Sequence, residues 1–202
     1  MTKLIGITGR SGSGKGAACR IFAQMGIPTI DTDAIYHEIL TKKGPCTDEL
    51  VSAFGREILD EGGLVDRRRL SGAVFGQKNT PSLLHTLNTI THKYIMAEAY
   101  AQLRELSRGG AKAVLLDAPQ LFEAHLENEC DITLAVIADD ERCIARIMAR
   151  DGITRERASA RLAAQHTNDF FREHCTAVIE NNADLAALTL SVCQFIKDFK
   201  VG

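Results

Sequence analysis

Five short apolar segments along the chain predict the strands of one sheet. They cover about 3–8, 27–30, 112–117, 132–138 and 176–180. The third and fourth segments are apolar at nearly every position, not only at every second one. Continuous apolar runs are typical of parallel strands that are covered on both faces. The pattern therefore favours a parallel sheet.

Segments with helical spacing lie between these predicted strands. Helices are predicted over about 15–25 and 140–150, and onwards from Asp33, Thr154 and Asp184. Strands that alternate with helices along the chain are typical of α/β proteins, in which the helices cover a parallel sheet. The order of the elements therefore predicts an α/β fold.

The segment from about 46 to 108 interrupts this alternation, because it contains no convincing strand. Apolar side chains recur there at steps of three and four residues, which is the period of one helix face. They are Leu87, Ile90, Tyr94, Ala97 and Ala101. Such a long helical block is too large for one crossover, so it predicts a helical lobe beside the sheet.

The composition narrows the class of protein. Of the 202 residues, 45% are hydrophobic and 25% are charged, which is ordinary for a globular chain and argues against disorder. The 24 basic and 26 acidic residues give a formal net charge of −2, which disfavours broad binding to nucleic-acid phosphates. No apolar run approaches the ~20 residues that span a bilayer, so no membrane segment is predicted.

The six cysteines favour a reducing compartment. None of them form a C-x-x-C pair, and most lie within apolar or helical segments. We therefore expect free thiols and a cytoplasmic protein. The six histidines show no spacing to cysteines or carboxylates that is typical of a metal site.

A glycine-rich loop follows the first predicted strand and precedes the first predicted helix. Gly9 to Lys15 fit the G-x-x-x-x-G-K part of a phosphate-binding loop. Glycines let main-chain N–H groups turn towards phosphate oxygens, and the lysine reaches the β- and γ-phosphates. The alternative is a purely structural turn, against which the lysine and the strand–helix context argue. The predicted ATP-binding residues are Gly9, Ser11, Gly12, Ser13, Gly14, Lys15, Gly16 and Ala17.

Position 16 departs from this motif. The usual residue is Ser or Thr, whose hydroxyl is a ligand of Mg²⁺, but here Gly16 is followed by Ala17 and Ala18. Asp117, which ends a predicted strand, resembles the acid that contacts Mg²⁺ directly or through water. We therefore predict Asp117 as the Mg²⁺ residue. A residue of a strand-end turn is the alternative.

Two further acids, Asp31 and Asp33, follow the second predicted strand. Ligands of open parallel sheets bind at the carboxyl ends of the strands, so both are expected near the phosphate-binding loop. Phosphoryl transfer to an alcohol needs a carboxylate that orients the hydroxyl and accepts its proton. Asp33 is the first candidate and Asp31 the second, although Asp33 as a mere helix cap weighs about equally. Glu123 is a weaker candidate for a contact with the acceptor.

Arginines gather around position 151, although the net charge of the chain is negative. They are Arg142, Arg146, Arg150, Arg155, Arg157 and Arg161. Arg146 and Arg150 are four residues apart and share one face of a helix. Guanidinium groups suit the charge of a transferring phosphoryl group, so the cluster is predicted to contact phosphate. For any single member the alternative is a solvated face paired with Glu141 or Glu156.

Taken together, these segments resemble the dephospho-coenzyme A kinase family. Six segments carry the resemblance in the order in which the family has them. They read IGITGRSGSGKG, TIDTDAIYHEIL, FGREILDEGGLVDRRRLSGAVF, LLDAPQLFE, RIMARDGITRERASARLAAQ and VIENNADLAAL. Any one segment would be weak evidence for the resemblance, whereas six segments in the right order are strong evidence.

The resemblance implies a P-loop kinase fold of the NTPase and nucleoside-monophosphate-kinase type, with a five-stranded parallel sheet flanked by helices. Within one domain over 1–202, a core would cover about 1–32, 110–150 and 175–202. A helical acceptor-binding lobe would cover about 33–109, and a lid about 150–174. The implied reaction is phosphorylation of the ribose 3′-hydroxyl of dephospho-CoA by ATP, with Mg²⁺.

The resemblance implies Asp33 as the catalytic base. Together with it, we predict Lys15, Arg146 and Arg150 as catalytic residues. The predicted acceptor-binding residues are Asp31, His92, Asp117, Glu123 and Arg161. No oligomeric state is implied.

Three positions depart from the family pattern, and two other functions stay in view. Gly16 replaces a hydroxyl residue, Gln120 replaces an apolar residue, and Lys93 replaces the proline that usually follows His92. The last change predicts that this helix runs on unbroken. One alternative is another small-molecule or nucleoside-monophosphate kinase of the same fold. The other is a non-catalytic nucleotide-binding module.

Overall fold

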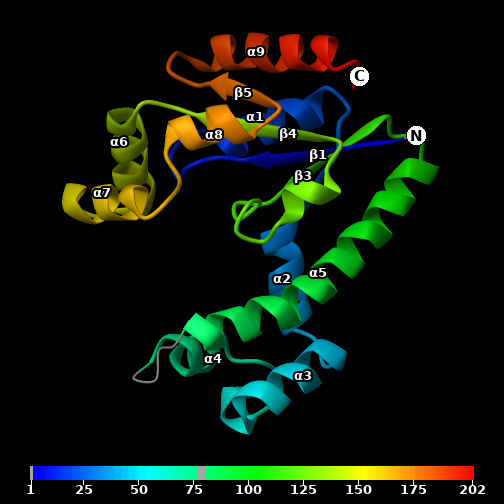
Figure 1. Ribbon diagram of the computed structural model, residues 1–202, viewed down its shortest axis with the longest axis vertical. Helices are drawn as coiled ribbons and strands as arrows, with labels where there is room; N and C mark the ends of the chain where they lie inside the picture. Colours follow the sequence, from blue (N-terminus) through cyan, green and yellow to red (C-terminus); the bar gives the residue numbers. More distant parts are fainter. Residues whose placement is uncertain (1, 77–80) are drawn as a thin grey trace. The chain divides into compact units, whose positions relative to one another are not determined.

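The computed structural model describes residues 2–76 and 81–202 and contains a parallel sheet in the order β2–β3–β1–β4–β5 (Figure 1). The strands are β1 (Lys3–Thr8), β2 (Thr29–Asp31), β3 (Ala113–Asp117), β4 (Ile132–Ile137) and β5 (Ala177–Glu180). All five predicted strands are present, and the predicted α/β class is confirmed. The second strand is predicted over 27–30 and covers Thr29–Asp31 in the structure; Pro28 has no N–H to donate, although its carbonyl oxygen accepts from Leu115 N at 2.8 Å.

The register of the central strands explains where the glycine-rich loop lies. β1 pairs with β3 and β4, and Ile7 lies opposite Asp117 on one side and Leu134 on the other. The chain leaves β1 only one residue later, so the loop that follows starts beside the end of β3. β3 and β4 are buried along almost their whole length, as their continuous apolar pattern predicts.

Helices cover both faces of the sheet. α1 (Lys15–Gln24) and α9 (Leu185–Asp198) pack together against one face, where the rings of Phe22 and Phe195 meet edge to face at 5.6 Å (Figure 1). α8 (Asn168–His174) contributes Phe171 to the cluster on the other face. The sequence analysis did not identify α8, which is only seven residues long.

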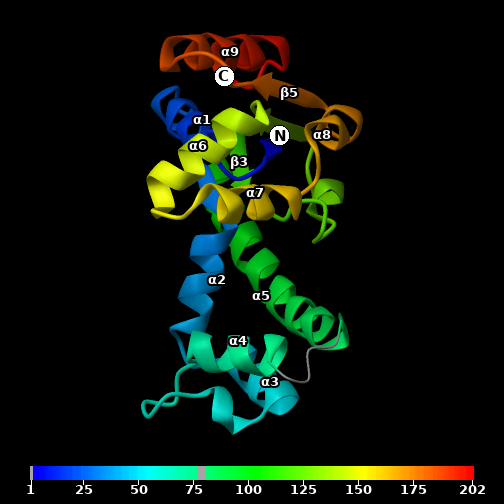
Figure 2. The same ribbon diagram turned by 90° about the vertical axis from the view of Figure 1, so that its left-hand side faces the viewer.

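Two helices next to the loop pack on each other, α6 (Asp140–Asp151) and α7 (Arg155–Ala163) (Figure 2). Gly152 adopts a left-handed conformation that ends α6, and the Thr154 hydroxyl caps α7. Both helices lie where the sequence predicts them.

The chain divides into two compact units, one with residues up to Ile30 and from Leu103 onwards, the other spanning Asp31–Gln102. In its described residues the second unit is mostly helical, and it has its own buried cluster around Leu40, Leu50 and Ile58. Its elements are α2 (Thr32–Leu40), α3 (Pro45–Phe54), the 3₁₀ turn η1 (Arg56–Ile58), α4 (Arg67–Phe75) and the greater part of α5 (Pro81–Arg108).

The long helix α5 continues through Lys93, so the prediction of an unbroken helix is confirmed. Within the described part of 46–108, only an isolated bridge between Leu59 and Val65 has β pairing, and the rest of the segment is helical or turn. A second 3₁₀ turn, η2 (Leu126–Glu129), follows β3 in the other unit.

All six cysteines carry free thiols, as expected. No helix in the two described ranges has the length and apolar character to cross a membrane.

Candidate active site

A pocket of about 470 Å³ lies over the loop between β1 and α1. Residues of the loop form one wall, and Pro119, Arg146, Arg150 and Gln165 come from segments later in the chain. Of these four, the sequence analysis singled out the two arginines. The pocket lies entirely within the unit that contains the sheet core.

The main chain of the loop has no room for side chains at three glycines, Gly9, Gly12 and Gly14, and the last two lie deepest in the motif. Gly12 has φ +78°, and a Cβ there would come within 2.4 Å of the Cys143 carbonyl oxygen. Gly14 has φ +100°, and a Cβ there would come within 2.1 Å of Asn181 Nδ2. The left-handed conformations and the close neighbours explain why these two positions require glycine.

Arg146 and Asn181 hold the loop by its carbonyl oxygens. Arg146 Nη1 donates to Gly12 O at 3.1 Å and to Ser13 O at 3.2 Å, and its Nη2 donates to Asn181 O at 3.2 Å. The buried Asn181 side chain donates from Nδ2 to Ser13 O at 2.8 Å. A trans peptide directs its C=O and N–H to opposite sides, so these contacts turn loop N–H groups the other way. We call Arg146 and Asn181 the loop brace.

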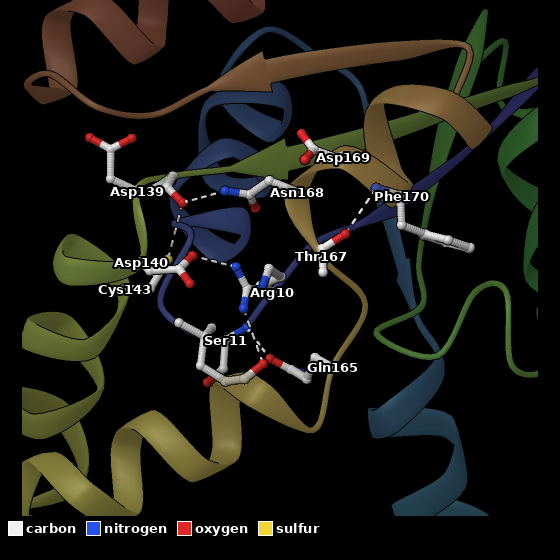
Figure 3. A network of polar contacts seen from close by, with 12 residues as sticks. Arg10, Ser11, Asp139, Asp140, Cys143, Gln165, Thr167, Asn168, Asp169 and Phe170 are labelled. Atoms are coloured by element: carbon white, nitrogen blue, oxygen red, sulfur yellow. Dashed lines mark hydrogen bonds and ion pairs between the residues drawn. The ribbon is translucent and has the colours of Figure 1, made fainter.

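Arg10 and Gln165 connect the loop to the helices beyond it (Figure 3). The Arg10 guanidinium is buried, pairs with Asp140 at the start of α6, and donates to Leu162 O at 3.1 Å. Gln165 Oε1 accepts from the Ser11 main-chain N–H at 2.9 Å. Neither contact is predicted from the sequence, since nothing local to either residue signals its distant partner.

Lys15 and Asp117 form an ion pair beside the loop. Lys15 begins α1 and Asp117 ends β3, and their side chains are only 17% and 14% exposed. The Cys19 thiol lies 3.6 Å from the second Asp117 oxygen, to which it donates. The structure thus brings together the predicted phosphate-binding lysine and the predicted Mg²⁺ carboxylate.

The residues near Asp117 suit a magnesium ion held mostly by its substrate. Mg²⁺ commonly takes one or two protein carboxylates, phosphate oxygens and water. Among the described residues, no group of three or more His, Cys, Asp or Glu side chains could hold a metal ion. Gly16 is exposed, and a Cβ there would meet only Arg20 Nη1 at 3.9 Å. One carboxylate at the loop therefore fits the ion.

Arg150, which lines the pocket, and Arg161 share one carboxylate, that of Asp151. Arg150 donates from Nε and Nη2 to the two Asp151 oxygens at 2.7 and 2.9 Å, and Arg161 pairs with the same carboxylate. These hydrogen bonds, those of Arg150 first, lower the pKa of Asp151 to about 2. Arg150 Nη2 also lies 3.4 Å from Ser11 Oγ. Both residues fall in the segment over about 150–174 for which a lid is predicted, so we call Arg150 and Arg161 the lid arginines.

Other members of the arginine cluster have acidic neighbours on the surface. Arg155 donates to Glu141 at 2.6 and 2.8 Å, and Arg142 lies 4.0 Å from Asp139. For these two residues the structure matches the solvated alternative. The cluster thus divides into residues that line the pocket and residues that do not.

Three predicted residues, Asp31, Asp33 and His92, belong to the helical unit. The structure corrects the capping alternative, because α2 starts at Thr32 and the Asp31 side chain accepts from Ala34 N at 3.0 Å. Asp33 is exposed in the first turn of α2 and is not the cap. His92 is half-buried in α5, and burial lowers its pKa.

Glu123 is exposed and lies outside the lining of the pocket. Its Oε1 lies 3.5 Å from His166 Nε2, in the segment between α7 and α8. The predicted contact of Glu123 with an acceptor stays a prediction.

Comparison with known proteins shows which family this chain resembles. The family profile of dephospho-CoA kinase matches residues 3–187. The dephospho-CoA kinase of Carboxydothermus hydrogenoformans is 33% identical over 197 residues, which covers 98% of this chain and 94% of that protein.

Solved structures agree with this comparison. The crystal structure of TT1252 from Thermus thermophilus has a TM-score of 0.79 and 32% identity, and the match covers 98% of this chain and 97% of that one. Shikimate kinase from Acinetobacter baumannii has a TM-score of 0.53 and 19% identity over 100% and 97% of the two chains, and supports the kinase fold alone. The chain belongs to the dephospho-CoA kinase family.

Proposed function

We propose that this protein transfers the γ-phosphoryl group of ATP to the ribose 3′-hydroxyl of dephospho-CoA, giving coenzyme A and ADP. The observation that carries the proposal is the braced loop over Gly9 to Lys15 with its pocket, in a chain whose match to the family covers 3–187. The loop supplies main-chain hydrogen-bond donors for the phosphates of ATP. Membership of the family supports dephospho-CoA as the acceptor substrate.

Lys15 is the cation that exchanges partners when ATP binds. Its ammonium pairs with Asp117 in the structure, and in the proposed complex it reaches the β- and γ-phosphates. The carboxylate of Asp117 is then available to hold Mg²⁺. When bound, this ion neutralises charge on the phosphate oxygens. Gly16 contributes no hydroxyl, so Asp117 is the protein ligand that we propose.

Asp33 is the residue that we propose to orient the acceptor hydroxyl and take its proton. The cap of α2 is Asp31, so the capping role no longer competes with this one. Asp31, His92 and Glu123 are proposed as acceptor contacts.

The lid arginines are proposed to close over the transferring group. Both side chains are about half exposed, so they can leave Asp151 for phosphate oxygens without a large desolvation change. Closure also excludes water from the reacting phosphate, which limits hydrolysis of ATP.

Replacing Asp33 by Asn tests the catalytic assignment. General-base contributions are about 10²–10⁴-fold, so Asp33→Asn is expected to lower kcat by that factor and to keep ATP affinity. The matched control is Asp48→Asn, an exposed acid in the first turn of α3 that is expected to behave as wild type. Turnover of Asp33→Asn at the wild-type rate would refute the assignment.

A coupled assay with several acceptors tests the substrate. We expect ADP formation with dephospho-CoA and none with AMP, CMP or shikimate. Turnover with a nucleoside monophosphate alone would replace the proposed substrate. ATP binding without phosphorylation of any acceptor, at all Mg²⁺ concentrations, would favour a non-catalytic module.

A further inference from the structure

One main-chain N–H of the phosphate-binding loop donates a hydrogen bond to a side chain of the protein itself. Gln165, in the segment between α7 and α8, lines the pocket and points at the loop (Figure 3). Its Oε1 accepts from the Ser11 main-chain N–H at 2.9 Å. Ser11 lies in the middle of the G-x-x-x-x-G-K motif, whose N–H groups are the donors for phosphate oxygens.

An amide oxygen and a phosphate oxygen are acceptors for the same hydrogen, and one N–H makes one well-aligned hydrogen bond. We propose that Gln165 is a positioning residue that holds the Ser11 N–H and yields it to a phosphate oxygen when a nucleotide binds. Gln165 therefore competes with ATP and ADP for this donor. The proposal rests on the proposed function, since it takes the ligand of the loop to be a nucleoside di- or triphosphate.

The segment that carries Gln165 is anchored, so that only the side chain has to move. The ring of His166 stacks on Phe170, with centroids 3.7 Å apart and an interplanar angle of 8°. Asn168 Nδ2 donates to Ala138 O at 2.9 Å, and the Thr167 hydroxyl caps α8. Gln165 itself is exposed. Rotation of its side chain releases Ser11 while these anchoring contacts stay in place.

The strength of the competition follows from the single hydrogen bond that must be given up. Water replaces the amide when Gln165 is truncated, and the intramolecular bond exceeds the bond to water by a modest amount. That difference corresponds to about 2- to 10-fold in a dissociation constant. A carboxylate at the same place would accept more strongly from the N–H and would also repel phosphate.

Calorimetric titration of the full chain with ADP and with ATP, at fixed Mg²⁺, tests the proposal. We expect Gln165→Ala to bind both nucleotides about 2- to 10-fold more tightly than wild type. Gln165→Glu is expected to bind both at least ~10-fold more weakly. Gln194→Ala, an exposed glutamine on α9, is the matched control and is expected to bind as wild type does. Thermal melting without nucleotide checks that each variant is folded.

The opposite signs separate competition from a structural role. A Gln165→Ala variant that binds as wild type or more weakly would overturn the proposal, because Gln165 would then be inert or would support the binding loop. Gln165→Glu binding as tightly as wild type would overturn it as well. Failure of the proposed function shows differently: wild type would bind ATP and show the same pattern among the variants, yet transfer nothing to dephospho-CoA.

Discussion

Arg146 and Arg150 are one turn apart on α6, yet they do different things. Arg146 is half-buried and gives its donors to three main-chain carbonyl oxygens, two of them in the phosphate-binding loop. Arg150 is exposed and gives its donors mainly to the carboxylate of Asp151. Two arginines on the same face of one helix therefore differ in role: Arg146 fixes the loop, and Arg150 can exchange its partner for phosphate.

The two regions also differ in how much they contribute to stability. Hydrogen bonds from a charged donor to partly buried carbonyls contribute about 1.5–3 kcal/mol, and breaking them leaves unsatisfied acceptors. Exposed ion pairs contribute about 0–1 kcal/mol. We expect the loop brace to matter for folding and for binding, and the lid arginines to matter mostly for binding and turnover and only slightly for stability.

The largest effect is expected from a side chain at Gly14, the loop residue that packs against Asn181 of the loop brace. Gly14→Ala combines a left-handed backbone with a Cβ 2.1 Å from Asn181 Nδ2, so the loop must change shape. We expect ATP affinity to fall at least ~100-fold, measured by calorimetry. Gly72→Ala, where a Cβ meets nothing within 4 Å, is the control and should bind ATP as wild type does. Normal affinity in Gly14→Ala would contradict the brace.

Truncating Arg146 and Arg150 in turn compares the loop brace with the lid arginines directly. Arg146→Ala is expected to lower the free energy of unfolding by about 1–3 kcal/mol, because loop carbonyls lose their donors. Arg150→Ala is expected to change it by less than about 0.5 kcal/mol while lowering kcat/KM for ATP. Urea unfolding monitored by circular dichroism gives the free energy of unfolding of both variants. Equal destabilisation by the two substitutions would remove the distinction.

Acid is expected to weaken the contact of the lid arginines with Asp151. The pKa of Asp151 is lowered to about 2 from an ordinary value of 3.8 by its arginine partners. A depressed pKa means that this contribution to stability is present above about pH 4 and is lost as the pH falls towards 2. The difference in melting temperature between wild type and Asp151→Asn should therefore be larger at pH 5 than at pH 2.5. A constant difference would show that the pair contributes nothing through its charge.

The smallest effect is expected at Gly16, which belongs to neither region. The site is exposed and has room for a side chain, so Gly16→Ser should fold normally. Ser also has the higher helix propensity, by about 0.5 kcal/mol. The new hydroxyl should lower the Mg²⁺ concentration for half-maximal turnover by a few-fold. Gly16→Ala shares the propensity effect without the hydroxyl, so an equal shift in both variants would exclude metal ligation by the serine.

Features that depend on short stretches of sequence could be predicted, and features that depend on distant contacts could not. The strands and the loop from Gly9 to Lys15 follow from apolar runs and from a spacing within seven residues. The contacts of Gln165 with Ser11 and of Arg10 with Asp140 join residues 154 and 130 positions apart. Only the folded chain brings these pairs together.

Two further details could not be predicted either, one local and one that depends on distant contacts. Asp31 and Asp33 are both good capping residues, and the choice between them depends on whether the helix starts at Thr32, which propensities do not decide. The role of Arg146 depends on which way the loop carbonyls point. Helix spacing places Arg146 and Arg150 on one face but does not say what that face meets.

Transfer of labelled phosphate tests the central claim most directly. The protein is incubated with γ-³²P-labelled ATP, Mg²⁺ and dephospho-CoA, and the products are separated and counted, with Lys15→Met as the inactive control. We predict that the label appears in coenzyme A, at the 3′-phosphate that a 3′-nucleotidase releases, and that the control produces none. Label found only in inorganic phosphate, or no transfer at all by the wild-type protein, would contradict the account.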